Sequence, residues 1–366
     1  YIVWVTYRAQ FCIKGKACMM FHRRQQGVSF LMKVLVTGAA GFIGMHTVIR
    51  LLNDGHEVIG LDNLNDYYDV NLKRARLTHI GAPNQFSFCE GDLADNDAVT
   101  ELFQSHRPQV VINLAAQAGV RYSLENPHSY IQANVLGFTN ILEACRHYDV
   151  ENLVFSSSSS VYGLNTSIPF SEASSANHPL ALYGATKKAN EMMAHSYAHL
   201  FGLPCTGLRF FTVYGPWGRP DMALFLFTKA VLAGEPIDVF NHGKMVRDFT
   251  YIDDIVEGVV RLVSKPATAD ETFDTSAPNP AASTAPYRLF NIGNGQPTPL
   301  MDYIAAIEDA TGKKAIMNYL PMQAGDVMTT SADTTLLGDW VGFQPDTPVA
   351  EGVARFVAWY RDYYNG

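Results

Sequence analysis

A glycine-rich turn between a strand pattern and a helix pattern constrains the fold of this chain more than any other feature. Lys33–Thr37 is a short β-branched run, three glycines follow it, and Phe42–Asn53 has the apolar spacing of a helix. Glycines at this spacing let the backbone turn sharply, approach a phosphate and pack the helix on the strand. The helix N-terminus then stabilises an anion through its unpaired N–H groups. We expect five turn residues to contact a dinucleotide: Gly38, Gly41, Phe42, Ile43 and Gly44.

Strand patterns alternate with helix patterns along the first part of the chain. Further strands are predicted at 58–61, 86–89, 110–114, 153–156 and 206–210, and helices at 94–105, 129–148 and 183–201. Such alternation indicates right-handed βαβ units and a parallel sheet covered on both faces. We therefore predict an α/β fold, a Rossmann doubly wound parallel sheet, with a dinucleotide-binding domain over residues 32–215.

The pattern becomes less regular after residue 215. Helices are predicted at 223–233, 253–263 and 300–311 and a strand at 237–240, while 265–286 is rich in Pro, Ala, Ser and Thr and predicts a surface loop. We expect residues 216–366 to form mainly a smaller, irregular substrate-binding lobe, with some segments returning to the Rossmann domain. Such a lobe would lie over the carboxyl edge of the sheet, where ligands bind in open α/β folds.

The first 31 residues do not share this patterning. They contain five basic and no acidic residues and precede the abrupt start of the first strand pattern. We expect a non-native or disordered extension, such as an upstream segment or a wrongly chosen start codon. A basic targeting presequence is the alternative.

Composition narrows the class of protein. A net charge of −8 argues against a nucleic-acid binder, which needs a basic face. The five cysteines are scattered without zinc-ligand spacing, so we expect no metal site and reduced thiols, which fits a cytoplasmic location. No apolar run reaches the roughly 20 residues that a membrane-spanning helix needs.

An acidic residue ends the second predicted strand. Asp62 lies 18 residues after Gly44, where a carboxylate accepts hydrogen bonds from the adenosine ribose and repels a 2′-phosphate. This position predicts NAD rather than NADP. Other loops follow strands at the same edge of the sheet, and from them and the neighbouring helix we expect further cofactor contacts from Asn63, Asp92, Leu93, Ala115, Ala116, Asn134 and Ser156.

A tyrosine and a lysine four residues apart begin a predicted helix. This spacing places Tyr183 and Lys187 on one face of the helix. A phenol is a poor base at neutral pH, and a neighbouring ammonium lowers its pKa toward the working range. The serine run at 156–160 ends the fifth strand nearby, and we expect Ser158 to hydrogen-bond the reacting oxygen. These residues predict an enzyme with Tyr183, Lys187 and Ser158 as catalytic residues.

The combination of GxxGxxG, a strand-terminal Asp, a serine run leading into Val-Tyr-Gly, and YxxxK resembles the extended short-chain dehydrogenase/reductase family, of the NAD-dependent epimerase/dehydratase type. Segments at 62–69, 118–123, 209–222, 247–254 and 325–327 further resemble its UDP-glucuronate 4-epimerase branch. The resemblance covers the chain from Met32 almost to its C-terminus.

The resemblance implies an isomerase that epimerises UDP-glucuronate to UDP-galacturonate at C4, through a 4-keto intermediate and with tightly bound NAD. In that mechanism Tyr183 takes the 4-hydroxyl proton, Lys187 binds the nicotinamide ribose and Ser158 bonds O4. Related decarboxylases and dehydratases carry Glu where this chain has Ser160, which favours epimerisation. The alternatives are a 4-epimerase of UDP-glucose or UDP-N-acetylglucosamine and a non-catalytic NAD-binding regulatory protein.

The resemblance also bears on the substrate-binding residues and on assembly. It implies that Arg247 and Arg288 bind the diphosphate. Arg121 and Arg219 are candidate cations for either the C6 carboxylate or a phosphate. Hydroxyl donors to the carboxylate are expected from Ser158, Ser159, Ser160 and Thr212. The family pairs the helices predicted at 129–148 and 183–201 between subunits, which implies a homodimer.

Overall fold

The structure, a computed structural model, describes residues 31–323 and 326–365. The prediction for the first 31 residues falls outside the described residues, apart from Leu31, and so does Gly325 of the segment at 325–327. From Met32 onward the chain forms one compact unit.

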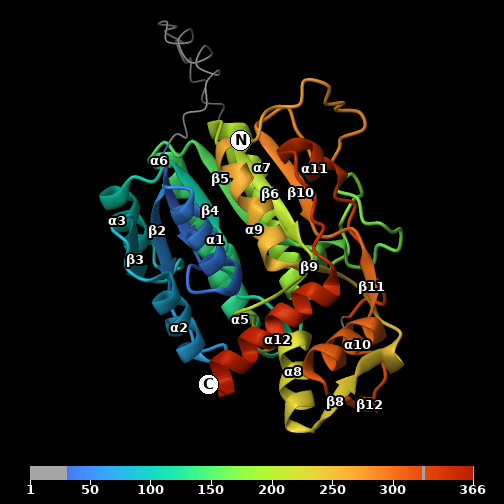
Figure 1. Ribbon diagram of the computed structural model, residues 1–366. Coiled ribbons are helices and arrows are strands. Elements are labelled where there is room, and N and C mark those ends of the chain that lie inside the picture. The colour runs from blue at the N-terminus through green and yellow to red at the C-terminus, as the bar shows by residue number, and fades with distance from the viewer. Residues whose placement is uncertain (1–30, 324–325, 366) are drawn as a thin grey trace, which may run out of the picture. The chain divides into compact units, whose positions relative to one another are not determined.

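A parallel sheet of seven strands forms the centre of this unit (Figure 1). Its strands are β1 (Lys33–Thr37), β2 (Glu57–Asp62), β3 (Phe86–Glu90), β4 (Val110–Asn113), β5 (Asn152–Ser158), β6 (Cys205–Phe210) and β10 (Tyr287–Ile292). They lie in the order β10-β6-β5-β4-β1-β2-β3, and every neighbouring pair is parallel. The first six strands have the Rossmann order, which confirms the predicted α/β class.

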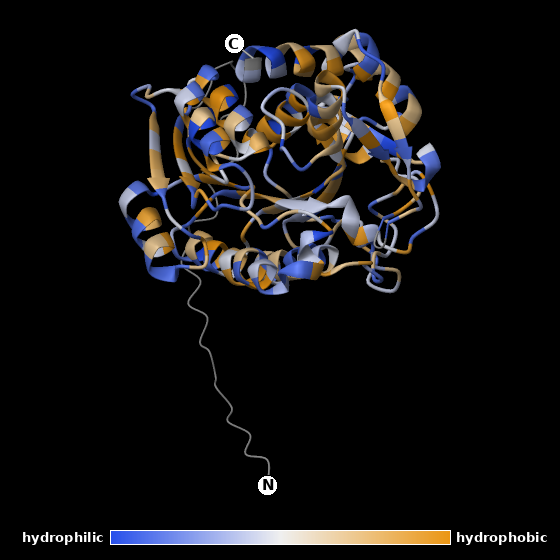
Figure 2. Cartoon of the chain, turned by 90° about the horizontal axis from the view of Figure 1, so that it is seen from below, coloured by the Kyte–Doolittle hydropathy of each residue, from blue (hydrophilic) through white to orange (hydrophobic). Residues whose placement is uncertain are grey.

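Helices cover both faces of the sheet, as Figure 2 shows in a view along its edge. One face carries α1 (Phe42–Asn53), α2 (Val70–Ile80) and α9 (Ile252–Arg261), and the other carries α3 (Asn96–His106), α6 (Gly137–His147) and α7 (Leu182–Phe201). Side chains of a strand point alternately to the two faces. Val34 and Val36 accordingly pack in the apolar cluster of α1 and α9, whereas Leu35 packs in the cluster of α3, α6 and α7.

Besides α9 and β10, the described residues after β6 form two small sheets and four α-helices. The sheets are β11-β9-β7 and β12-β8, made of β7 (Thr212–Tyr214), β8 (Pro236–Val239), β9 (Val246–Tyr251), β11 (Pro297–Pro299) and β12 (Ile316–Tyr319). The helices are α8 (Ala223–Ala233), α10 (Leu300–Thr311), α11 (Thr335–Val341) and α12 (Val349–Asn365). The helices predicted at 223–233 and 300–311 are confirmed, and residues 265–286 contain no helix or strand.

The helix predicted at 129–148 is divided. It consists of α5 (Pro127–Tyr130), a π-helical segment at Ile131–Leu136 and α6, preceded by the short α4 (Tyr122–Glu125). The wider π turn contains Asn134, whose amide forms two hydrogen bonds with the backbone of Gln117. Segments of this kind are frequent at functional sites.

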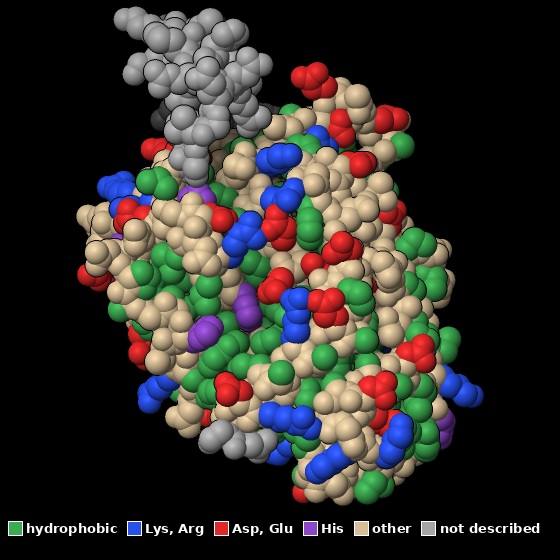
Figure 3. Space-filling model, viewed as in Figure 1, with side chains coloured by type: hydrophobic (Ala, Val, Ile, Leu, Met, Phe, Trp, Pro, Cys, Tyr) green, Lys and Arg blue, Asp and Glu red, His purple; other side chains and the backbone are tan. Residues whose placement is uncertain are grey.

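No helix in the described part of the chain is both long and apolar enough to cross a membrane. On the face shown in Figure 3, acidic and basic side chains are interspersed. Glu257 of α9, for example, forms ion pairs with Arg50 and Arg261.

Candidate active site

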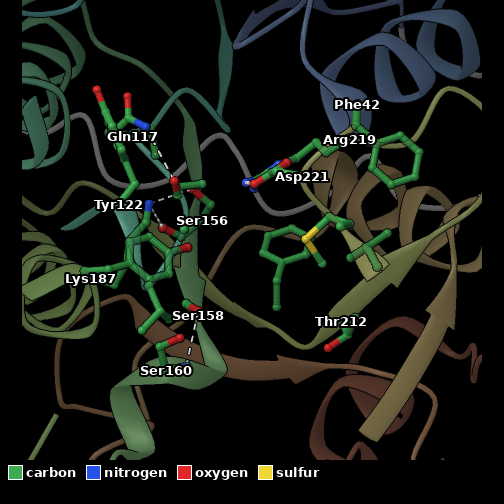
Figure 4. Close-up of a pocket in the computed structure, with 18 of the residues that line it drawn as sticks. Phe42, Gln117, Tyr122, Ser156, Ser158, Ser160, Lys187, Thr212, Arg219 and Asp221 are labelled. Atoms are coloured by element: carbon green, nitrogen blue, oxygen red, sulfur yellow. Dashed lines mark hydrogen bonds and ion pairs between the residues drawn. The ribbon is translucent and has the colours of Figure 1, made fainter. Parts of the chain in front are cut away.

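A cavity of about 850 Å³ lies at the carboxyl edge of the main sheet. In Figure 4, Ser156, Ser158, Ser160 and Lys187 lie on one side of it, and Arg219 and Asp221 lie across from them. The predicted site residues that line the cavity are Gly38, Gly41, Phe42, Ile43, Gly44, Asp62, Asn63, Asp92, Leu93, Ala115, Ala116, Arg121, Ser156, Ser158, Ser159, Ser160, Tyr183, Lys187, Thr212, Arg219 and Arg247.

The glycine-rich turn between β1 and α1 forms one wall of the cavity. Gly38 has a φ of +72°, which glycine adopts without strain. A Cβ at Gly38 would lie 2.9 Å from the backbone N of Ala115, and one at Gly44 would overlap the carbonyl oxygen of Gly38. Helix α1 begins with no side-chain cap and no acidic residue in its first turn, so its N–H groups remain available to an anion. This backbone fits a pyrophosphate.

Asp62 at the end of β2 holds the turn in place. Its Oδ2 accepts the Ala40 N–H at 3.1 Å and its Oδ1 accepts the Leu64 N–H at 2.9 Å. A carboxylate has about four acceptor positions, so acceptor capacity remains for ribose hydroxyls. Asn63 donates to Asp92 Oδ2 at 2.8 Å and joins the loops after β2 and β3. These residues fit the adenosine end of a dinucleotide.

Asn134 does not line the cavity, although we expected it to contact the cofactor. Its Oδ1 accepts the Gln117 N–H at 2.8 Å, and its Nδ2 donates to the Gln117 carbonyl at 3.0 Å and to Thr186 Oγ1 at 3.1 Å. Asn134 therefore holds the loop after β4 against α7 from behind the cavity wall.

Tyr183 and Lys187 lie one turn apart at the start of α7. Lys187 Nζ donates to the Ser156 carbonyl at 2.8 Å and to Ser156 Oγ at 3.0 Å, which accounts for two of its three N–H groups. Burial lowers the pKa of Lys187 to about 7. Burial also raises the pKa of Tyr183, while the Ser158 hydroxyl and the charge of Arg219 oppose that rise. A phenolate at Tyr183 therefore depends on hydrogen-bond donors and positive charges placed around it.

Arg219 faces the catalytic side of the cavity and is held by a carboxylate. Its Nη2 lies 2.5 Å from Asp221 Oδ2 and its Nε lies 3.0 Å from Asp221 Oδ1, a bidentate geometry. The Tyr67 hydroxyl also donates to Asp221, at 3.2 Å. On the opposite side, the N–H of Ser160 donates to Ser158 Oγ at 3.2 Å, which fixes the end of the serine run.

The other predicted arginines differ in their placement. Arg121 and Arg247 line the cavity, and Arg121 lies 3.7 Å from Asp326. Arg288 does not line it, so the expectation that Arg288 binds the diphosphate is not supported. It belongs to β10, the edge strand, and its guanidinium lies 3.3 Å from Asp270 in the surface loop.

Several lining residues were not identified from the sequence. Among them are Gln117, Tyr122, Asp221, Phe240 and Asp326. For Asp221 a signal exists, because a carboxylate two residues after an arginine can pair with it. Asp326 lies in the segment at 325–327 that resembles the family, whereas Phe240 reaches the cavity through long-range packing, which no local pattern reports.

Residues 34–277 match the profile of the NAD dependent epimerase/dehydratase family. The chain belongs to this family. It is 50% identical over 338 residues to a probable UDP-glucuronate 4-epimerase of Rhizobium meliloti. The aligned region covers 91% of this chain and 98% of the relative.

Solved structures of named epimerases share the whole fold. The chain matches a UDP-glucuronic acid 4-epimerase from Bacillus cereus in complex with UDP-glucuronic acid and NAD, with a TM-score of 0.81 and 33% identity over 91% of this chain and 100% of that one. It also matches a Thermotoga maritima UDP-glucose 4-epimerase with UDP-glucose, with a TM-score of 0.78 and 31% identity over 91% of this chain and 99% of that one.

Replacing Gly44 with Ala is expected to weaken NAD binding at least about tenfold, because the new Cβ meets the Gly38 carbonyl and the turn must open. NAD retained by the purified protein and its affinity by calorimetry measure the effect. Gly312→Ala is the control: Gly312 ends α10 at a φ of +66° with nothing within 4 Å, so that change costs about 1 kcal/mol of stability and leaves NAD bound. Full NAD occupancy in Gly44→Ala would refute this role of the turn.

Proposed function

We propose that this chain is an NAD-dependent 4-epimerase that interconverts UDP-glucuronate and UDP-galacturonate. The observation that carries the proposal is one cavity lined by the glycine-rich turn, by Tyr183, Lys187 and Ser158, and by arginines of the second half of the chain. The Rhizobium and Bacillus relatives support the choice of sugar. In this proposal residues 32–215 hold mainly NAD, and residues 216–366 hold mainly the nucleotide sugar.

Each catalytic side chain has one task in this reaction. When bound, NAD supplies the reversible oxidation at C4 of the sugar. Tyr183, as phenolate, removes the proton of the 4-hydroxyl and returns it after the 4-keto sugar has presented its other face. Lys187 binds the nicotinamide ribose with its remaining N–H and stabilises the phenolate by its charge. Ser158 donates a hydrogen bond to O4.

Both sides of the cavity supply groups for a C6 carboxylate. Ser159, Ser160 and Thr212 offer hydroxyls, and Arg219 offers a cation that Asp221 already holds in place. Charge-assisted hydrogen bonds to a carboxylate are about twice as strong as neutral ones. A neutral hexose is the second candidate, because the structure of an epimerase with UDP-glucose is nearly as similar.

The test is to incubate the purified protein with UDP-glucuronate and to follow the C4 configuration by proton NMR. We expect UDP-galacturonate to form without added NAD, because the cofactor is regenerated in each turnover. Conversion of UDP-glucose but not UDP-glucuronate would establish the second candidate instead. A UDP-pentose product would show decarboxylation and refute the proposal.

We also propose a homodimer formed by the helices around residues 129–201. Their outer surface exposes Ile131, Leu136, Met192, Leu200 and Phe201. Met192→Glu is expected to shift the sedimentation mass from dimer to monomer, because it buries a charge in an apolar contact. Leu164→Glu, at an exposed apolar residue of the loop that precedes α7, serves as the control and leaves the mass unchanged. A monomeric wild-type chain would exclude the dimer.

A further inference from the structure

Arg76 of α2 is a fully buried cation without a carboxylate partner among the described residues. Its guanidinium instead donates to neutral oxygens. Nη1 lies 3.1 Å from the Ala40 carbonyl and 2.6 Å from the Tyr68 hydroxyl. A buried charge is costly unless hydrogen bonds compensate it. The cost of burying this charge therefore suggests that the groups accepting the Arg76 hydrogen bonds need to be held in place.

The remaining acceptors belong to a segment that leads into the cavity, Gly215–Arg219, which we call the strap. Arg76 Nε and Nη2 donate to the Trp217 carbonyl at 3.2 and 2.6 Å, and Nη2 donates to the Gly218 carbonyl at 3.3 Å. Trp217 has a φ of +64°, a left-handed conformation that costs a non-glycine residue about 1–2 kcal/mol. Such a conformation persists only where its surroundings hold it.

A second side chain holds the strap from α1. His46 Nε2 lies 3.0 Å from the Pro216 carbonyl, which can only accept, so this nitrogen carries the proton. Burial lowers the pKa of His46 to about 4, so the ring is neutral near pH 7. Side chains of α1 and α2 thus form hydrogen bonds with three consecutive carbonyls of the strap, those of Pro216, Trp217 and Gly218. The next residue is Arg219, whose guanidinium enters the cavity.

We propose that Arg76 is a positioning residue for nucleotide-sugar binding, because it ties the strap to Ala40 of the glycine-rich turn and thereby fixes Arg219. The inference rests on the proposed function in that Arg219 contacts the nucleotide sugar. If the strap were mobile, Arg219 would lose conformational entropy each time a ligand bound, and this loss would weaken the affinity. Hydrogen bonds from Arg76 fix the strap before the ligand binds, so this entropy is not lost on binding.

Arg76→Lys in the NAD-loaded protein tests this role. Lysine keeps the charge but lacks the planar fork that reaches Ala40 and the strap together. We expect the Kd for UDP-glucuronate, measured by calorimetry, to rise about tenfold and KM to follow, while kcat changes less than about threefold. Arg74→Lys, at an exposed residue of the same helix, should leave the Kd unchanged.

A double-mutant cycle with Arg219→Lys separates positioning from general destabilisation. If Arg76 acts through Arg219, the two changes together weaken binding little more than Arg219→Lys alone. Fully multiplicative effects, or an unchanged Kd in Arg76→Lys, would overturn the proposal.

Should Arg76→Lys fail to fold, His46→Phe gives a second test, because it keeps a ring against Phe42 and removes the bond to Pro216. His46→Phe should raise the Kd for UDP-glucuronate about twofold to threefold, but should not raise it further when Arg219→Lys is already present. An unchanged Kd in His46→Phe would contradict the proposal that the strap is held in place. The readout is binding, so a chain that binds UDP-glucuronate without converting it would refute the proposed function and leave the role of Arg76 measurable. A wild-type chain that binds no UDP-glucuronate would refute both.

Discussion

Tyr183→Phe is expected to lower kcat for the interconversion of UDP-glucuronate and UDP-galacturonate by about 10³-fold, within the range that general acid–base catalysis contributes. In the proposed mechanism, the change removes the oxygen that exchanges a proton with the 4-hydroxyl, and it leaves the ring in place. Lys187 stays bonded to Ser156, and the glycine-rich turn is untouched. The variant should therefore keep its NAD and bind UDP-glucuronate with nearly the wild-type Kd.

A matched change on the same helix controls for the loss of a phenolic hydroxyl. Tyr197 of α7 lies outside the cavity, and its hydroxyl donates to Glu143. Tyr197→Phe should keep kcat within about twofold, because no bond to the reacting groups changes. Rates are read by NMR or by a coupled assay, and bound NAD is read from the absorbance of the denatured protein. Retained activity in Tyr183→Phe would show that another group is the base.

Helix α2 was not predicted from the sequence patterns. Its buried positions are Leu72, Lys73, Arg76 and Ile80, so two of its four inward side chains are cations. A hydrophobic period cannot reveal a helix whose inner face is charged. The helices at 223–233 and 300–311 have mainly apolar inner faces, and their predicted bounds are confirmed.

Strand β10 was also not predicted from the sequence, for a different reason. It follows the long loop at 265–286 and joins the sheet by pairing with β6, which precedes it by some eighty residues. Such pairing depends on tertiary contacts that a local window does not contain. Arg288 is the second residue of β10, so it lies at the amino end of its strand, away from the carboxyl edge of the sheet where the cavity lies.

The site was more predictable than the second half of the fold. Residues that follow parallel strands meet at one edge of the sheet, so the loops after β1, β2, β4 and β5 could be assigned to one cavity from their order alone. Phe240 comes from an irregular segment of the second half, and Arg76 acts on the site through the strap and Ala40 without lining the cavity. Their roles depend on distances that the chain order does not contain.

A buried ion pair next to the serine run at 156–160 gives the largest expected effect on stability. Glu191 of α7 and Arg209 of β6 are both fully buried, with N–O distances of 2.8 and 2.9 Å. Burial alone would raise the pKa of Glu191, but the hydrogen bonds and charge of Arg209 hold it below its usual value. Ser157 also donates to Glu191, at 2.7 Å, so the pair anchors the end of β5 to the helix that carries Tyr183 and Lys187.

Glu191→Leu is expected to lower the free energy of unfolding by about 3–5 kcal/mol, because it leaves the Arg209 charge buried without a partner. The double variant Glu191→Leu/Arg209→Met should recover most of this loss, because no fully buried charge remains; Lys188, which also pairs with Glu191 at 3.0 Å, has a side chain that is 17% exposed. Lys33 and Glu57 form a pair of similar length, 2.9 Å, whose side chains are 32% and 53% exposed. Glu57→Gln should therefore cost no more than about 1 kcal/mol.

Urea denaturation of the four proteins measures these differences. Equal losses in Glu191→Leu and Glu57→Gln would show that burial does not strengthen the pair, and a double variant no more stable than Glu191→Leu would show that packing rather than charge causes the loss. Recovery of stability need not restore activity in the double variant. Ser157 would lack its acceptor there, and β5 would lose one bond that sets Ser158 against Tyr183. We therefore expect a folded double variant with a reduced kcat, which separates what the pair contributes to stability from what it contributes to the site.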